Sequence, residues 1–292
     1  MGDGTTTVLP YKKEGGVNGT FILYTTTTLP DGALAGEFSV SATKKVLFSQ
    51  GNLVATVDAT GAPTAWKFAA NQYDCIGEGG ANKTIGKTAG DVDLFGWSTA
   101  KSNYGISTST EDSDYSGDFV DWGKAIGDGN TWHTLSKDEW GYLLGMELDH
   151  DFYVPNTEHP RAEKLGLATV NSVPGLVLLP DIWELPSGCS FTATSLDESC
   201  CVTDDKNFAL NSYATTEWSQ MESAGAVFLP AAGERSVSYV LSVGDVGCYW
   251  NASFSEENSA DFLNVNNYNI PLEISDRYYG YSVRLVTDVP AK

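Results

Sequence analysis

Hydrophobic and polar residues alternate along several short segments of the chain, which is the pattern of half-buried β-strands. From Phe38 to Leu53 the alternation continues on both sides of Ala42–Lys45, and this arrangement predicts a β-hairpin that turns at those residues. Similar short segments predict the other strands. In chain order the other expected strands are Ala65–Phe68, Gly175–Pro180, Ala226–Leu229, Val237–Leu241, Tyr249–Trp250, Ala260–Val265 and Ser282–Val286.

Two segments carry the longer apolar period of α-helices. Ser136 and Glu139 have the spacing of a capping box, which predicts a helix whose apolar face is Trp140, Leu143 and Leu144. A second helix is expected to begin near Thr215 or Thr216 and to end at Gly225, with apolar positions at Trp218, Met221 and Ala224. Two helices among many short antiparallel strands and long loops predict an α+β domain.

The longest irregular segment, residues 76–131, is rich in Gly, Ser, Thr and Asp and is expected to form packed or functional loops. Its expected anchors in the core are Leu94, Phe95, Trp97, Trp122 and Trp132. Residues 1–36 are rich in Thr and Gly around one apolar stretch, Thr20–Tyr24, and are interpreted as an N-terminal arm, a linker or the tail of a preceding module. A single domain is then expected over residues 37–292.

Composition limits the partners that this domain can have. The chain has 292 residues, of which 41% are hydrophobic, and a net charge of −21 with only 17 Lys and Arg residues. Nucleic acid and anionic membrane surfaces are therefore not expected partners, because phosphate binding needs a basic surface. The sequence has no apolar run of 18 residues, so no membrane insertion is expected, and no signal peptide is visible at its start.

The residues that often carry metal or thiol chemistry are sparse. The odd number of cysteines, Cys75, Cys189, Cys200, Cys201 and Cys248, and the absence of zinc spacing predict free or buried thiols. Residues 80–88 have the wrong spacing for a phosphate loop. A calcium loop that begins at Asp112 has Gly123 where the bidentate Glu belongs, so no cofactor is expected. A weak structural Ca²⁺ on Asp112, Asp114 and Asp118 stays open as an alternative.

The segment from Cys248 to Val286 combines a short apolar frame with many Asn, Tyr, Asp and Ser residues. Such a mixture suits a contact surface, because Tyr gives rigid amphipathic contact and Asn and Ser give adaptable hydrogen bonds. In the expected strand at 260–266, Leu263 and Val265 share one face and belong in a core. Phe262, Asn264 and Asn266 share the other face, which is expected to be displayed. Arg284, between apolar neighbours, is interpreted as salt-bridged to the fold.

Several segments in one order resemble a known family. They are residues 38–46 with 48–53, 71–74 with 93–97, 134–140, 177–181 with 185–188, 225–233, 249–250, and Gly280 with 282–286. Over about residues 37–287 the chain resembles exported and phage-associated proteins of gut Bacteroidales that have a C-type-lectin-like domain. That domain is related in fold to the formylglycine-generating enzyme, and the resemblance implies a C-type-lectin-like fold.

Some members of that group are variable proteins of diversity-generating retroelements, whose C-terminal segment is mutated at template adenines. The resemblance places a structural frame on Tyr249, Trp250, Leu263, Val265, Arg277, Gly280 and Ser282–Val286. It implies ligand-binding residues at Asn251, Phe254, Ser255, Phe262, Asn264, Asn266, Tyr268, Ile274, Ser275, Asp276, Tyr278, Tyr279 and Tyr281. Glu256, Glu257 and Glu273 depart from the pattern, because adenine changes in an Asn codon do not produce Glu.

The resemblance implies a non-enzymatic receptor or adhesin that binds a protein or a cell-surface glycan. It also implies a location outside the cell, on the cell surface or on a phage particle. Two alternatives stay open. One is an enzyme of the formylglycine-generating type, although Cys248 lacks the paired cysteine of that chemistry. The other is a surface-layer or fimbria-like subunit that uses residues 1–36 as a donor strand. The sequence leaves the oligomeric state open.

Overall fold

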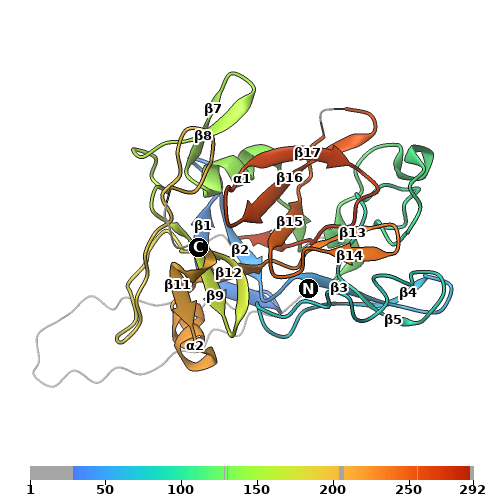
Figure 1. Cartoon of the computed structure of the whole chain (residues 1–292), viewed down its shortest axis with the longest axis horizontal. Helices are drawn as coiled ribbons and strands as arrows, with labels where there is room; N and C mark the ends of the chain where they lie inside the picture. The colour runs from blue at the N-terminus through green and yellow to red at the C-terminus, as the bar shows by residue number, and fades with distance from the viewer. Residues whose placement is uncertain (1–28, 128, 130, 204–206, 255, 290–292) are drawn as a thin grey trace, which may run out of the picture.

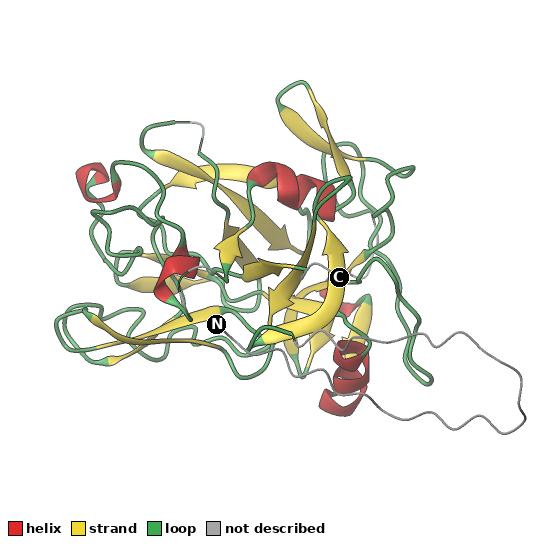
Figure 2. Ribbon diagram, turned by 180° about the vertical axis from the view of Figure 1, so that it is seen from behind, coloured by secondary structure: helices red, strands yellow, loops and turns green. Residues whose placement is uncertain are grey.

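The computed structural model describes residues 29–127, 129, 131–203, 207–254 and 256–289. These residues form two α-helices and many short strands, which are arranged in several small sheets joined by long loops (Figures 1 and 2). The expected α+β class is therefore confirmed. No helix in this part of the chain is long and apolar enough to cross a membrane. The apolar stretch Thr20–Tyr24, and most of the expected arm, lie outside the described residues.

The first and last strands of the described chain lie in one sheet. Its order is β1 (Ala33–Ser39), β2 (Lys45–Ser49), β18 (Leu285–Asp288) and β6 (His133–Thr134). The predicted hairpin is confirmed, because β1 and β2 pair with Phe38 opposite Val46. Strand β1 begins at Ala33, so the folded domain starts ahead of the boundary expected at residue 37.

A second sheet has the order β11 (Asn211–Tyr213), β9 (Leu165–Val170), β10 (Val173–Leu178) and β12 (Val227–Pro230). Strands β10 and β12 correspond to the apolar runs predicted at 175–180 and 226–229. Helix α2 (Thr215–Ser223) packs against this sheet with Trp218 and Met221, both buried as expected. Gly225 ends the helix at φ +100°, and a Cβ there would lie 2.9 Å from Gly36 Cα. This position therefore requires glycine both for its dihedral angle and for its close packing.

Helix α1 (Lys137–Leu143) begins at the predicted capping box. Ser136 Oγ accepts a hydrogen bond from Glu139 N at 3.2 Å, and Glu139 Oε2 accepts one from Ser136 N at 2.9 Å. Trp140, Leu143 and Leu144 are buried in the same core as β1 and β2. The sequence prediction of this helix is therefore confirmed both in its start and in its buried face.

The third sheet consists of β15 (Val246–Trp250), β16 (Ser259–Asn266) and β17 (Leu272–Asp276) (Figure 1). Its side chains contribute to two separate cores. Leu263 contributes to the core that contains α1, whereas Phe262, the next residue, contributes to a second core. Residues of the 76–131 loops form much of this second core. All five expected anchors in these loops are buried, namely Leu94, Phe95, Trp97, Trp122 and Trp132.

Smaller elements complete the described chain. β3 (Leu53–Val57) pairs with β4 (Pro63–Phe68) and β5 (Gly90–Val92), β7 (Met146–Asp149) with β8 (Phe152–Pro155), and β13 (Glu234–Ser236) with β14 (Tyr239–Leu241). Single 3-10 turns lie at Asp112–Tyr115, Trp122–Ala125 and Asn207–Ala209. All five cysteines are free, as expected.

Candidate ligand-binding surface

The structure divides the thirteen residues implied as ligand contacts into displayed and buried groups. Phe254, Tyr268, Ile274 and Asp276 are exposed, with exposed fractions of 48%, 79% and 49% for the first three. Five more are half-buried, and Ser255 lies outside the described residues. The half-buried residues are Asn264, Asn266, Ser275, Tyr278 and Tyr279. Asn251, Phe262 and Tyr281 are buried, so the expectation that these three are displayed is wrong.

Asn251 has a structural role in the loop after β15. Its backbone oxygen accepts a hydrogen bond from Trp97 Nε1 at 3.0 Å, and its side-chain Oδ1 accepts one from Ser253 N at 2.8 Å. The side-chain oxygen therefore helps to shape the loop that carries Phe254, whereas Nδ2 is buried and has no hydrogen-bond partner among the described residues. A buried Asn of this kind cannot be distinguished from a displayed Asn by residue type alone.

Phe262 is only 5% exposed because the loop segment 76–131 covers its face of the sheet. Its ring centre lies 4.7 Å from that of Tyr281, which in turn lies 4.5 Å from that of Trp250. The alternation expected along β16 therefore holds for Leu263 to Asn266 but fails at Phe262. Both faces of the strand are buried there, so an apolar residue on either face belongs to a core.

Two further tyrosines, Tyr278 and Tyr279, extend this buried cluster towards the surface. The rings of Tyr278 and Tyr279 stack with centres 4.8 Å apart and an interplanar angle of 28°. The rings of Tyr279 and Tyr281 are 6.1 Å apart at 16°. Tyr281 is fixed by a hydrogen bond of 2.8 Å between its hydroxyl and Ser275 Oγ, and burial raises its pKa. We call Tyr278, Tyr279, Tyr281, Phe262 and Trp250 the aromatic stack.

Arg277, a residue of the expected frame, holds together the loops beside this stack. Its guanidinium donates hydrogen bonds to the backbone oxygens of Ser259, Tyr115, Gly117 and Glu256 at 3.2 to 3.3 Å. The four oxygens belong to two backbone segments, 115–117 and 256–259, and a planar guanidinium suits such a set because its donors are fixed in one plane. Burial lowers the pKa of Arg277 from its usual value, whereas the nearby Glu257 raises it.

The guanidinium of Arg277 also lies against two aromatic rings, which contact each other. Its central carbon is 4.3 Å from the centre of the Trp97 ring and 4.8 Å from that of Phe254. Phe254 is therefore held in place on one face while its other parts remain exposed. Phe254, Asp276, Tyr278 and Tyr279, which adjoin around Arg277, are referred to below as the Tyr278 surface.

The Asn residues of β16 serve a different purpose from the one expected. Asn266 Oδ1 accepts hydrogen bonds from Tyr268 N at 2.8 Å and Asn269 N at 3.0 Å, and Asn264 Nδ2 donates to Glu273 Oε2 at 2.9 Å. These amides shape the turn between β16 and β17, which presents Tyr268. That turn lies at the far end of the hairpin from Asp276, which pairs with Ser259. Tyr268 is therefore not part of the Tyr278 surface.

The other frame residues implied by the resemblance are buried, as a structural role requires. Gly280 is needed because a Cβ there would lie 2.7 Å from Nε of the buried Arg235. Arg284 differs from expectation, because it forms no salt bridge with a described carboxylate. Its guanidinium donates to Gln72 Oε1 at 2.7 Å and Asn52 Oδ1 at 3.3 Å, and burial lowers its pKa to about 10.

The thiol and carboxylate groups that could carry other chemistry are poorly placed for it. Burial, together with Glu234 and Glu273, raises the pKa of the Cys248 thiol well above its usual value. Asp112, Asp114 and Asp118 are exposed, and no three potential metal ligands gather among the residues that the structure describes. The loop that carries these aspartates is instead held by Arg277 through the backbone of Tyr115 and Gly117.

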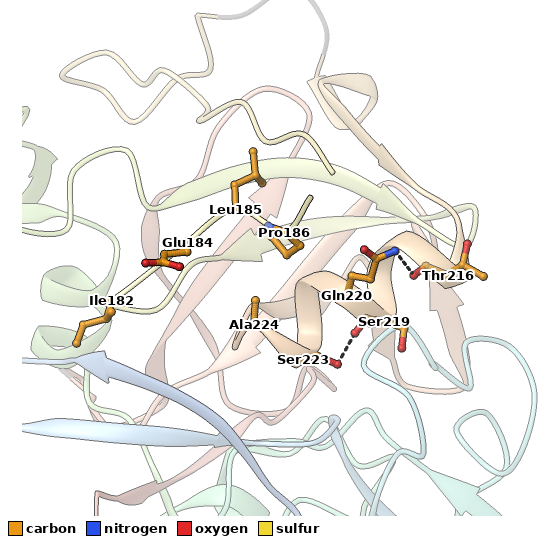
Figure 3. Close-up of a pocket in the computed structure, with 9 residues that line it drawn as sticks. All are labelled: Ile182, Glu184, Leu185, Pro186, Thr216, Ser219, Gln220, Ser223 and Ala224. Atoms are coloured by element: carbon orange, nitrogen blue, oxygen red, sulfur yellow. Dashed lines mark hydrogen bonds between the residues drawn. The ribbon is translucent and has the colours of Figure 1, made fainter. Parts of the chain in front are cut away.

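A pocket lies elsewhere, between helix α2 and the loop at residues 182–186 (Figure 3). Its volume is about 710 Å³, and none of the thirteen expected residues lines it. The polar side chains that helix α2 contributes to this pocket form hydrogen bonds within the helix. Ser223 Oγ donates to Ser219 O at 2.7 Å, and Gln220 Nε2 donates to Thr216 O at 3.4 Å. Glu184 is its single titratable side chain, so the pocket offers no acid–base pair.

Sequence reasoning missed two groups of residues that shape the Tyr278 surface. Trp97, which the sequence predicted only as a core anchor, and Tyr115 come from the loops, and Arg235 from β13 reaches Leu94 O and the backbone of Gly280. Periodicity gave no signal for these long-range contacts. Glu256 and Glu257 depart from the pattern of variable positions. Two consecutive carboxylates near aromatic residues are nevertheless themselves a signal of a charged contact surface. Comparison of the chain with protein-family models, curated proteins and solved structures yields no match.

Proposed function

We propose that the chain is a non-enzymatic ligand-binding protein of the receptor or adhesin type, which contacts its ligand through the Tyr278 surface. The observation that carries this proposal is the aromatic stack. Tyr278 and Tyr279 are half-buried, and the rings behind them continue through Tyr281 to the buried Trp250. Their orientation is set before a ligand arrives, so little side-chain entropy is lost on binding.

A C-type-lectin-like scaffold is part of the proposal. The pairing of strands at the two ends of the described chain, the two helices and the long loops packed on one face of the β15–β16–β17 sheet support it. Display of contact residues on loops above a rigid core is the usual arrangement of binding proteins. In keeping with the family that the sequence resembles, we propose that the protein acts outside the cell, at a cell surface or on a phage particle.

The chemistry of Cys248 argues against the alternative of an enzyme of the formylglycine-generating type. A nucleophilic thiol needs a lowered pKa and access to substrate. The Cys248 thiol has a raised pKa and is buried under the aromatic stack, next to Trp250 in the second core. The donor-strand alternative concerns residues 1–36, most of which lie outside the described chain.

The proposal is tested by replacing the two half-buried members at the outer end of the stack. A random peptide library displayed on phage and a glycan array are screened with the full chain, and the ligands obtained are then tested against Tyr278→Ala with Tyr279→Ala. We expect binding to fall by more than about tenfold, as for loss of aromatic residues at a contact centre. Tyr268→Ala, at the far end of the hairpin, is the matched control and should bind as the unchanged protein does. Equal binding by the double variant would overturn the proposal.

A further inference from the structure

We infer that the ligand of the Tyr278 surface is a basic protein segment, which lies extended along β17 with Lys or Arg side chains beside the tyrosines. This inference rests on the proposed function and adds the chemical class of the partner. It follows from three features of the surface, namely its carboxylates, their excess over the exposed cations beside them and the open edge of β17.

The carboxylates come from two loops that Arg277 holds side by side. One loop carries Glu256 and Glu257 and bonds Arg277 through Glu256 O, and the other bonds it through Tyr115 O and Gly117 O. Both loops are acidic on their exposed sides. The exposed carboxylates on them are Glu111, Asp112, Asp114, Asp118, Glu256 and Glu257. Asp276 is exposed at the end of β17, beside Tyr278, whose pKa it helps to raise.

The exposed carboxylates on these loops outnumber the exposed cations beside them. Arg277 and Arg235 are buried and donate to backbone oxygens. Lys101 Nζ is bonded to Ser116 Oγ at 2.8 Å, within the acidic loop. The surface therefore keeps an excess of negative charge where a ligand would approach, which favours a positively charged partner and speeds its encounter. The same charge disfavours anionic glycans, nucleic acid and a second copy of this chain, which carries a net charge of −21.

Strand β17 offers a backbone edge that suits a protein better than a glycan. It lies at the edge of its sheet, near the upper rim of the molecule in Figure 1. Asn264 N donates a hydrogen bond to Pro271 O, so these two residues form a hydrogen-bonded pair of the antiparallel ladder. Hydrogen-bonded and non-hydrogen-bonded pairs alternate along the ladder, and Ile274 falls in a non-hydrogen-bonded pair. Its N–H and C=O groups therefore point away from β16. No backbone bond from Ile274 to another described residue is found outside that ladder. An extended segment can add to such an edge.

Aromatic rings beside carboxylates also favour a cation. Tyr278 is stacked on Tyr279 but only half-buried, so its ring can accept a Lys or Arg side chain in the way that Trp97 and Phe254 already hold Arg277. Asp276 lies beside this tyrosine and would pair with the same cation. A neutral sugar would use the ring but would leave the carboxylates without a partner.

The test uses the full chain as the target of a random peptide library displayed on phage. We expect the enriched peptides to carry net positive charge and to bind at least about tenfold more weakly when NaCl is raised from about 50 mM to about 300 mM. Glu256→Lys, Glu257→Lys and Asp276→Lys together should abolish this binding. The matched control replaces Glu158, Glu163 and Glu198, which are exposed on other loops, by Lys. This variant should still bind the basic peptides.

Two outcomes separate this inference from the proposed function. Neutral or acidic peptides that still require Tyr278 and Tyr279, or neutral glycans bound equally at both salt concentrations, would overturn the basic partner and leave the binding surface intact. Basic peptides that bind both charge-reversed variants equally would also overturn it, because attraction to the overall charge would then suffice. If no peptide and no glycan depends on Tyr278 and Tyr279, both proposals fail.

Discussion

The guanidinium of Arg277 lies 4.3 Å from the centre of the Trp97 ring, and Trp97 N donates a hydrogen bond to Arg277 O at 2.7 Å. Two residues far apart in the sequence are thereby joined through both side chain and backbone. The contact attaches the 76–131 loops to the end of β17, at the place where Phe254 and the tyrosines are displayed. The Tyr278 surface therefore depends on a buried cation as well as on its sheet.

Replacement of Arg277 by Lys should loosen this region. A lysine keeps the charge but cannot donate to four backbone oxygens in one plane, so buried carbonyl groups lose their partners. We expect a loss of about 2–4 kcal/mol in the free energy of unfolding, measured by urea denaturation. Amide hydrogen exchange should quicken in residues 115–118 and 256–259, next to the lost hydrogen bonds.

Lys101→Ala is the matched control for this change, because Lys101 is an exposed cation on the same loops. Its removal should alter stability by less than about 0.5 kcal/mol. If Arg277→Lys were as mild as this control, Arg277 would not be what holds the two loops together.

The local elements of this fold were predictable, because their signals lie within a few residues. The hairpin around Ala42–Lys45 and the capping box at Ser136 specify backbone conformation locally, and both are confirmed. Gly225 likewise marks the end of α2 because its φ is positive. Pairings between distant segments, such as β18 with β2, have no comparable signal in one sequence.

The candidate site was predictable only in part, for a physical reason that Phe262 illustrates. Alternation along a strand distinguishes its two faces, but it does not say whether the second face meets water or another core. Loops that cover β16 bury Phe262, while the same face carries half-buried Asn264 further along. The predictions for Asn251 and Arg284 failed for a related reason, because distant segments bury both residues. The indole N–H of Trp97 donates to Asn251 O, and Arg284 donates to the side-chain oxygen of Gln72.

Alkylation of thiols should separate a binding protein from a thiol enzyme. Cys248 is buried and the pKa of its thiol is raised, so iodoacetamide at neutral pH should leave it unmodified in the native protein. Cys201 is half-buried and should react sooner. Peptide mass mapping before and after denaturation checks this order. Rapid native modification of Cys248 would instead favour the formylglycine-type alternative.

Acid should destabilise the protein partly through Asp181. This carboxylate bonds to Arg161 Nη1 at 2.8 Å, Lys45 Nζ at 2.9 Å and Ser39 N at 3.0 Å, and these partners hold its pKa well below the usual 3.8, although burial opposes them. A lowered pKa in the folded state contributes stability that is present above the unfolded value and lost as pH falls toward the folded value.

The corresponding measurement is urea denaturation of Asp181→Asn between about pH 5 and about pH 2. The variant should start less stable and should lose less stability over this range than the unchanged protein. The raised pKa of the buried Asp93 acts in the opposite direction and is common to both proteins, so the difference between them isolates Asp181. Parallel curves would show that the Asp181 pKa is not lowered by folding.

Phe262 and Tyr278 provide a direct test of which aromatic residues are structural and which are displayed. Phe262 is 5% exposed and packs on Tyr281 and Trp250, so Phe262→Ala should leave a cavity and cost about 3–5 kcal/mol. Tyr278 is half-buried at the outer end of the stack, and Tyr278→Ala should cost about 1 kcal/mol or less. Thermal unfolding of both variants measures the contrast. If Phe262→Ala cost little stability and Tyr278→Ala cost much, the assignment would be reversed. The stack would then be anchored at its outer end, and Tyr278 would not be available to a ligand.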